Sequence, residues 1–283
     1  MSRIALFTDS TAYIPPELVQ RYHITVVPQV LIWGTETFED GVDIQPNEFY
    51  ARLKTASIMP TTSQVTVAKV HQIFQQLLEQ DCQVLAILVS EKLSGTINSA
   101  VQAKNMLPAG APVEIVNSET IAMALGFQVL AAARAVEQGA SLSEAVALTH
   151  EAIRHTGLIM AVDTLEFLHR GGRIGGASRF LGTALNIKPI LEIRDGRVEA
   201  LERVRTRSKS LARVVELVEE KIAGRTPVRL ASLHANAEED AHTLMELTRP
   251  RINAVESVIS MVSPVVGTHT GPGAVGLAYM AGM

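Results

Sequence analysis

The sequence predicts an α/β protein in which an N-terminal parallel sheet is followed by a second sheet of mixed direction. In the first half, short β-branched and aliphatic runs alternate with helical patterns, which is typical of a parallel sheet. In the second half, Asp195-Gly196 separates two strand-like segments, and this pair is typical of an antiparallel hairpin. The pattern changes at Thr156-Gly157, so we expect one domain over residues 1–156 and another over 157–283.

The elements of the first half follow from apolar runs and helix-start signals. Proline in the first turn marks two helices, and Ser141 with Glu144 forms a capping box for another. Strands are predicted over residues 4–7, 24–32, 84–89 and 113–116. Helices are predicted over residues 16–22, from 46 onward, and over 67–78, 97–106, 121–137 and 142–155.

Residues 84–103 are the stretch around which the first half is organised. An apolar strand ends in a polar segment that contains Ser94, Gly95 and Thr96, and a helix follows. Because a helix that begins there points unpaired backbone N–H groups beyond the strand end, the stretch outlines an anion site. The alternative is that Ser94 or Thr96 only caps the helix.

Two further hydroxyl-rich segments are predicted near the same edge of the sheet. One is Thr8-Asp9-Ser10-Thr11, at the end of the first strand, and the other is Thr61-Thr62-Ser63-Gln64. The second segment is either a helix cap before residues 67–78 or a ligand contact. Since ligands of parallel α/β sheets bind beyond the carboxyl ends of the strands, both segments are candidate binding loops.

The second half contains strand patterns, helices and a loop of small residues. Strands are predicted over residues 158–162, 190–194, 197–201, 228–233 and 255–262. Helices are predicted over residues 164–170, 208–223 and 238–247. His269 lies between glycines, so we expect it in a loop, either exposed or lining a cleft. The glycines of residues 171–176 lack dinucleotide-binding spacing, and they are expected to end the preceding helix at positive φ.

Composition excludes several function classes. The 283 residues are 47% hydrophobic and 19% charged, with a formal net charge of −4, so no broad affinity for nucleic acid or acidic membrane is expected. A single cysteine excludes an intrachain disulfide. Neither a signal-peptide pattern nor a bilayer-length apolar run is present, so we expect a cytoplasmic protein without stable membrane insertion. The scattered histidines and the lack of nucleotide motifs predict no metal and no cofactor.

Positive charge is concentrated in one segment. From His169 to Arg213 there are eleven Lys or Arg residues against four Asp or Glu residues. These charges are either simply solvated or attractive to an acidic or phosphorylated partner.

A set of short motifs in fixed order covers the whole chain. They are Thr8-Asp9-Ser10-Thr11, Asp40-Gly41-Val42-Asp43-Ile44, Thr61-Thr62-Ser63-Gln64, Leu93-Ser94-Gly95-Thr96, Asp163-Thr164-Leu165-Glu166, Gly171-Gly172-Arg173-Ile174 and Gly267-Thr268-His269. In these motifs the chain resembles the DegV family, bacterial fatty-acid-binding proteins that include the carrier subunit of fatty acid kinase. Val65 is a departure, because the family usually has proline after Thr-Ser-Gln.

The resemblance implies a fold, a ligand and a partner. The fold is a three-layer α/β/α domain and a two-layer mixed-sheet domain, with a long-chain, palmitate-like fatty acid between them. The carboxylate is implied to bind Thr62 and Ser94, with His269 nearby and Thr61, Ser63, Gly95 and Thr96 around it. Arg173 is implied to serve phosphoryl transfer or kinase contact. A separate ATP-dependent fatty acid kinase subunit would form the acyl phosphate, so the protein itself would be a carrier with no catalytic residue.

Two alternatives remain at this point. Ser94 as nucleophile, His269 as base and Asp9 as orienting group would make a lipid esterase or acyltransferase. However, Ser94 lacks a nucleophile-elbow sequence. A DNA-binding regulator that uses the Arg-rich segment is disfavoured by the net negative charge and by the lack of a helix-turn-helix pattern.

Overall fold

The N-terminal half is built on a four-stranded parallel sheet. The computed structural model describes residues 3–182 and 187–283. The strand order is β2-β1-β6-β7, and all pairs in this sheet are parallel. The strands are β1 (Arg3–Asp9), β2 (Thr25–Val27), β6 (Cys82–Leu88) and β7 (Val113–Asn117).

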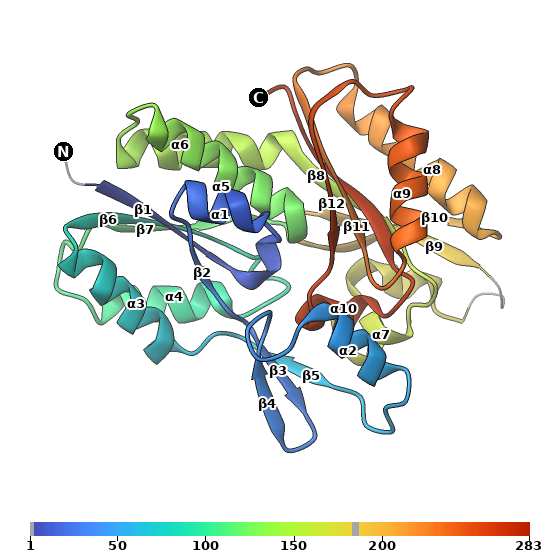
Figure 1. Ribbon diagram of the computed structural model, residues 1–283, viewed down its shortest axis with the longest axis horizontal. Coiled ribbons are helices and arrows are strands. Elements are labelled where there is room, and N and C mark those ends of the chain that lie inside the picture. Colours follow the sequence, from blue (N-terminus) through green and yellow to red (C-terminus); the bar gives the residue numbers. More distant parts are fainter. Residues whose placement is uncertain (1–2, 183–186) are drawn as a thin grey trace.

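Helices cover both faces of this sheet, as predicted (Figure 1). On one side lie α3 (Val67–Glu79) and α4 (Thr96–Asn105), and on the other α5 (Ala122–Glu137) and α6 (Leu142–His155). Alternate residues of β6 serve the two layers: Val84 packs in the cluster that contains Phe74 of α3, and Leu85 in the cluster that contains Phe127 of α5. The continuous apolar run is therefore explained by burial on both faces.

The C-terminal half is built on a six-stranded mixed sheet of order β10-β9-β8-β13-β11-β12. Its strands are β8 (Thr156–Ala161), β9 (Lys188–Arg194), β10 (Arg197–Val204), β11 (Val228–His234), β12 (Ala254–Met261) and β13 (Val275–Ala281). The β9–β10 pair is antiparallel across Asp195-Gly196, which confirms the predicted hairpin. Helices α8 (Arg207–Ile222) and α9 (Glu238–Thr248) cover one face (Figure 1).

The single strand predicted over residues 24–32 is wrong. The segment forms β2 and then β3 (Val30–Trp33), which belong to different sheets. Pro28 lacks an N–H and interrupts the ladder between them. Strand β3 pairs instead with β4 (Glu36–Glu39) and β5 (Thr61–Ser63) in a small third sheet.

The predicted loop at His269 is also wrong, because His269 lies on helix α10 (Pro264–Thr270). Pro264 occupies the first turn, where a missing N–H is tolerated. The helix packs against α2 (Pro46–Leu53), whose apolar face of Phe49, Tyr50 and Leu53 is buried. The other short helices are α1 (Pro16–Arg21), α7 (Glu166–Arg170), and the 3-10 turns η1 (Ser10–Ala12) and η2 (Gly175–Phe180).

Only some of the helix caps that the sequence predicts are present in the structure. The capping box at Ser141 and Glu144 is present. The N-cap of α3 is Thr66, outside the Thr61–Gln64 segment, and α4 follows Gly95 without a side-chain cap. Of the glycines that follow α7, Gly171 has φ −75° and Gly172 has φ +70°, so the expected positive φ occurs one residue after the cap.

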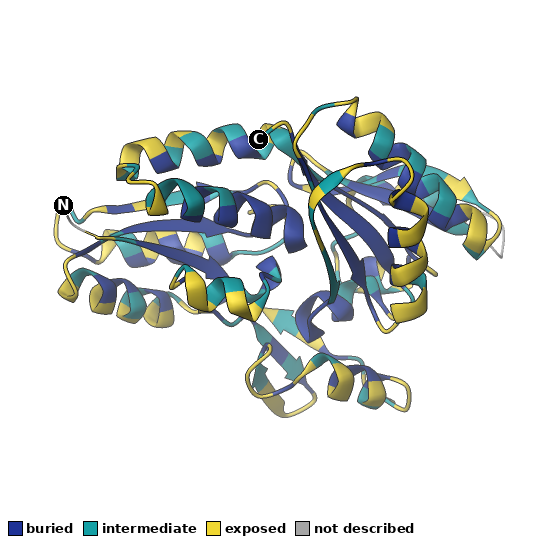
Figure 2. Ribbon diagram, turned by 45° about the horizontal axis from the view of Figure 1, so that its top comes forward, coloured by how far each residue is buried: buried dark blue, intermediate teal, exposed yellow. Residues whose placement is uncertain are grey.

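The two large sheets divide near the predicted boundary, since β8 begins at Thr156. One cluster of buried side chains nevertheless spans both halves, and includes Leu85 from β6 and Met160 from β8. Figure 2 shows the strands largely buried and the outer helix faces exposed. Two domains with limits at residues 1–156 and 157–283 stay a prediction. In residues 3–182 and 187–283, every helix is too short or too polar to cross a membrane.

Candidate ligand-binding site between the two sheets

A cavity of about 200 Å³ lies between the polar loops of the N-terminal half and the inner face of the six-stranded sheet. Most of its lining is aliphatic, with polar side chains contributed mainly by the N-terminal loops and by α10. Its lining includes Gln29, Thr62, Ser63, Ser94, Gly95, Leu158, Met160, Arg173, Leu233 and His269. The cavity therefore suits a ligand with an apolar body and a polar group.

The apolar wall follows from strand alternation in the six-stranded sheet. Leu158 and Met160 of β8 line the cavity, whereas Ile159 and Ala161 point to the opposite face and pack in the cluster beneath α8 and α9. Since successive side chains of a strand point to opposite faces, one apolar strand serves a helix layer and a cavity at once. Leu233 of β11 adds to the wall.

Thr62 faces the cavity from the centre of β5. Its neighbours on the strand, Thr61 and Ser63, are exposed, whereas Thr62 is half-buried. Thr62 Oγ1 lies 2.8 Å from His269 Nε2, which joins β5 to α10. Ser63 also reaches the cavity edge, but Thr61 is not among the lining residues. The alternation of the strand thus separates two threonines that the sequence leaves equivalent.

Ser94 lies just before α4, and its hydroxyl is hydrogen-bonded to the buried hydroxyl of Thr96. Ser94 Oγ lies 2.9 Å from Thr96 Oγ1, and Gln29 Nε2 donates to Thr96 Oγ1 at 2.8 Å. Thr96 is fully buried, so it orients Ser94 and does not line the cavity itself. Gly95 does line the cavity. The serine hydroxyl is therefore held in a fixed orientation beside the N-terminus of α4.

Arg173 spans from the C-terminal half to the Ser94 loop. Its Nε donates to the backbone oxygen of Leu93 at 3.0 Å, and its Nη1 donates to that of Gly171 at 2.7 Å. The side chain is partly buried at the cavity. Arg173 thus brings a positive charge to the polar end of the cavity and ties the loops on its two sides together.

His269 is enclosed between Thr62 and the end of α7. A Cβ atom added to Gly171 would overlap the imidazole ring at Nδ1, so the two elements are in direct contact. Among the described residues, Nδ1 has no hydrogen-bond partner. Burial, together with the charge of Arg173, lowers the pKa of His269 to about 4. The imidazole is therefore neutral at pH 7, with one nitrogen that donates and one that accepts.

Asp40 contacts the N-terminal end of α10, whereas His269 lies near its C-terminal end. The sequence did not predict this contact. Asp40 Oδ1 accepts a hydrogen bond from Val265 N at 3.1 Å, and its Oδ2 accepts one from Ser10 Oγ at 2.6 Å. Ser10 Oγ in turn accepts from Gln29 N. Burial raises the pKa of Asp40. The Asp40-Gly41 pair predicts only a turn, because the partner Val265 is distant in the sequence.

The serine-hydrolase constellation is not assembled. Within residues 3–182 and 187–283, the hydrogen bonds of His269 include Thr62 but neither Ser94 nor Asp9. Asp9 instead accepts from Thr11 and, through Oδ2, from Val89 N at 2.8 Å, which ties the ends of β1 and β6 together. The described residues also contain no cluster of three His, Cys, Asp or Glu side chains suited to a metal ion.

The positive segment is partly neutralised. Several of its arginines pair with acidic side chains: Arg194 with Glu192, Arg197 with Glu199, Arg207 with Asp240 and Arg213 with Glu202. Arg203, Arg205 and Lys209 are exposed. The remaining positive surface is therefore smaller than the sequence count indicates.

Comparisons with known proteins agree with this architecture. A family model described as "Uncharacterised protein, DegV family" matches residues 3–282. A DegV domain-containing protein of Streptomyces coelicolor is 38% identical over 280 residues, which cover 98% of each chain.

Solved structures show the same arrangement. The structure reported for fatty acid binding of a DegV family protein from Thermus thermophilus has a TM-score of 0.93 at 34% identity, covering 99% of each chain. DegV from Bacillus subtilis, described as a fatty acid binding protein, has a TM-score of 0.88 at 32% identity, over 99% of this chain and 100% of that one. The resemblance inferred from the motifs is confirmed, and the chain belongs to the DegV family.

Proposed function

We propose that this protein binds a long-chain fatty acid between its two sheets and presents the carboxylate to a separate ATP-dependent kinase. The observation that carries the proposal is the cavity itself, which has aliphatic walls and a polar end formed by Thr62, Ser94, Arg173 and His269. Similar proteins from Thermus thermophilus and Bacillus subtilis are described as binding fatty acids, which supports the ligand class.

The apolar wall accounts for affinity. Each methylene group that moves from water into an aliphatic cavity contributes about 0.8 kcal/mol. A palmitate-like chain that contacts Leu158, Met160 and Leu233 therefore gains most of its binding free energy from the wall. The head group adds orientation, since a carboxylate that leaves water must be hydrogen-bonded.

Thr62 and Ser94 are the proposed donors to the carboxylate. Both hydroxyls line the cavity, and both have a second polar partner that holds them, His269 for Thr62 and Thr96 for Ser94. Because the imidazole of His269 is neutral, its Nε2–H can donate to Thr62 Oγ1 and leave the threonine proton for the ligand. Ser63, Gly95 and Thr96 complete the surroundings.

Arg173 is the proposed group for phosphoryl transfer or kinase contact. A carboxylate oxygen would attack the γ-phosphorus of ATP, forming the acyl phosphate and releasing ADP, and a nearby guanidinium would offset the charge that develops. The exposed Arg203, Arg205 and Lys209 lie in the positive segment that would attract an acidic surface of the kinase. Such a partnership requires ATP, so we propose a cytoplasmic location.

The test compares ligands and variants by calorimetric titration of delipidated protein. Palmitate is expected to bind, and its methyl ester, which has the same chain without the anion, is expected to bind at least tenfold more weakly because hydrogen bonds to a charged group are lost. Ser94→Ala is expected to weaken palmitate binding and to leave ester binding unchanged. Equal affinity for acid and ester would contradict carboxylate recognition.

A further inference from the structure

The proposed site depends on how two short helices are held together. Helix α7 leads into Arg173, and α10 carries His269. The helices contact each other at glycines, which have no side chain. Gly171 lies against the imidazole of His269, and Gly271 lies against the ring of Phe167. A Cβ atom at either glycine would overlap its neighbour. The two helices are therefore closely packed. A contact that holds one helix relative to the other also holds Arg173 and His269 at the polar end of the cavity.

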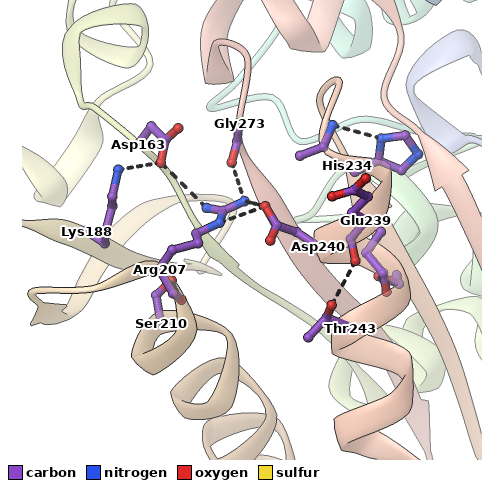
Figure 3. A network of polar contacts seen from close by, with 12 residues as sticks. Asp163, Lys188, Arg207, Ser210, His234, Glu239, Asp240, Thr243 and Gly273 are labelled. Atoms are coloured by element: carbon purple, nitrogen blue, oxygen red, sulfur yellow. Dashed lines mark hydrogen bonds and ion pairs between the residues drawn. The ribbon is translucent and has the colours of Figure 1, made fainter.

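A polar network at one end of the inner strands of the six-stranded sheet connects the segment before α7 to the segment after α10 (Figure 3). At its centre is Arg207, the first residue of α8. Its Nη2 donates to the backbone oxygen of Gly273 at 2.7 Å. Its Nη1, which has no hydrogen-bond partner among the described residues, forms an ion pair with Asp163 Oδ1 at 3.7 Å. Asp163 lies just before α7, and Gly273 follows the turn that ends α10.

Two further side chains hold the guanidinium in this orientation. Asp240 Oδ2 accepts from Arg207 Nε at 2.9 Å and from Nη2 at 2.7 Å, and Lys188 Nζ donates to Asp163 Oδ1 at 2.7 Å. The network thus contains two cations and two carboxylates, so its charges balance. Arg207 and Asp240 are partly buried, which limits the screening of their ion pair, whereas Asp163 is more exposed to solvent.

We propose that Arg207 is a positioning residue for the polar end of the cavity, because one rigid group links the segment before α7, through an ion pair, to the segment after α10, through a hydrogen bond. The planar fork of arginine suits this task, since it donates in several fixed directions at once. A lysine would keep the charge but could not reach Asp240 and Gly273 in the same geometry. The inference rests on the proposed function only in what it says about ligand affinity.

The test uses Arg207→Met, Arg207→Lys and the matched control Arg213→Met. Arg213 lies on the same helix and pairs with Glu202, Glu216 and Glu220, so its loss removes comparable ion pairs. The first readout is the NMR titration of the His269 ring in ligand-free protein, assigned with a His269→Gln variant. The second is palmitate affinity, and thermal unfolding reports on folding.

In Arg207→Met, α7 and α10 are expected to loosen and admit water, so that the pKa of His269 rises from about 4 toward the 6.5 of a solvated histidine. Palmitate affinity is expected to fall about tenfold, the equivalent of about 1.4 kcal/mol. Arg207→Lys is expected to show an intermediate pKa although the charge is kept, which separates geometry from electrostatics. Arg213→Met is expected to change neither readout.

An unchanged His269 titration in a folded Arg207→Met protein would overturn the inference, as would equal shifts in Arg207→Met and Arg213→Met. If Arg207→Met does not fold, Arg207→Lys decides, and a native titration in that variant overturns the inference. The titration needs no ligand. A shifted His269 titration with no palmitate binding by the native protein would therefore support the positioning role and contradict the proposed function.

Discussion

Thr62 Oγ1 and His269 Nε2 lie 2.8 Å apart although 207 residues separate them in the chain. The contact joins the small sheet of β3, β4 and β5 to α10, which leads directly into the six-stranded sheet. It stands at the polar end of a cavity whose walls are otherwise mostly aliphatic. The pair therefore couples the geometry of a proposed ligand donor, Thr62, to the packing of the two halves.

Thr62→Val tests whether this hydroxyl binds the ligand. The substitution keeps the shape of the side chain, removes its donor, and is expected to weaken palmitate binding about tenfold. Thr61→Val is the matched control, because Thr61 is the exposed neighbour on the same strand. Calorimetric titration measures both affinities. Equal losses in the two variants would contradict the assignment of Thr62.

Gly171→Ala tests the contact between α7 and His269. The new methyl group would overlap the imidazole, so the ring or the helix must move, at an expected cost of about 1–3 kcal/mol in the free energy of unfolding. Gly172→Ala is the control: its φ of +70° makes alanine unfavourable by about 1 kcal/mol, but no atom lies near the new methyl group. Palmitate affinity is expected to fall only in Gly171→Ala. Similar affinities in both variants would show that the ring can move without consequence.

The neutral state of His269 predicts a specific pH dependence of stability. Its pKa is lowered to about 4 in the folded protein, against about 6.5 when unfolded, so the unfolded chain binds more protons between these values. The associated stability is complete above pH 6.5 and is lost as the pH falls toward 4. Between pH 7 and 4.5 the native protein should lose about 2 kcal/mol more than His269→Gln.

Denaturant unfolding of both proteins at the two pH values measures this difference. Burial raises the pKa of Asp9 and of Asp40, which acts in the opposite direction, but both groups are present in both proteins and their effect cancels. An identical pH dependence in the two proteins would mean that His269 is not the group that titrates.

Arg173→Ala separates binding from phosphoryl transfer. Because the arginine also brings positive charge to the polar end of the cavity, palmitate affinity is expected to fall by up to about tenfold. Acyl phosphate formation by the kinase with ATP is expected to be abolished even when the variant is saturated with palmitate. Arg21→Ala serves as the control, because Arg21 is an exposed arginine that pairs with Glu137 in the N-terminal half. Native turnover in Arg173→Ala would exclude the role given to the arginine.

Local pattern was sufficient for most of the fold. The apolar run of β6, the hairpin at Asp195-Gly196 and the capping box at Ser141 each depend on near neighbours, and each was predicted correctly. The segment 24–32 failed because the apolar pattern continues through Pro28, while the choice of sheet depends on distant partners. The three-stranded sheet was missed for the same reason.

Only part of the candidate site could be predicted from the sequence. The motifs directed attention to Thr62, Ser94, Arg173 and His269, which the structure brings to one cavity. The helical state of His269 was missed, since a short helix made largely of valine and threonine with one glycine is stabilised by packing and not by propensity. The supports of the site, Asp40 at one end of α10 and Arg207 at the other, act through contacts that no local pattern reveals.

Native mass spectrometry of the purified protein, followed by solvent extraction, tests the central proposal most directly. The account predicts one co-purifying long-chain fatty acid per chain, which is released as the free acid on extraction and is reduced or absent in Thr62→Val. A protein that is purified empty and does not take up added palmitate would contradict fatty acid binding at this cavity.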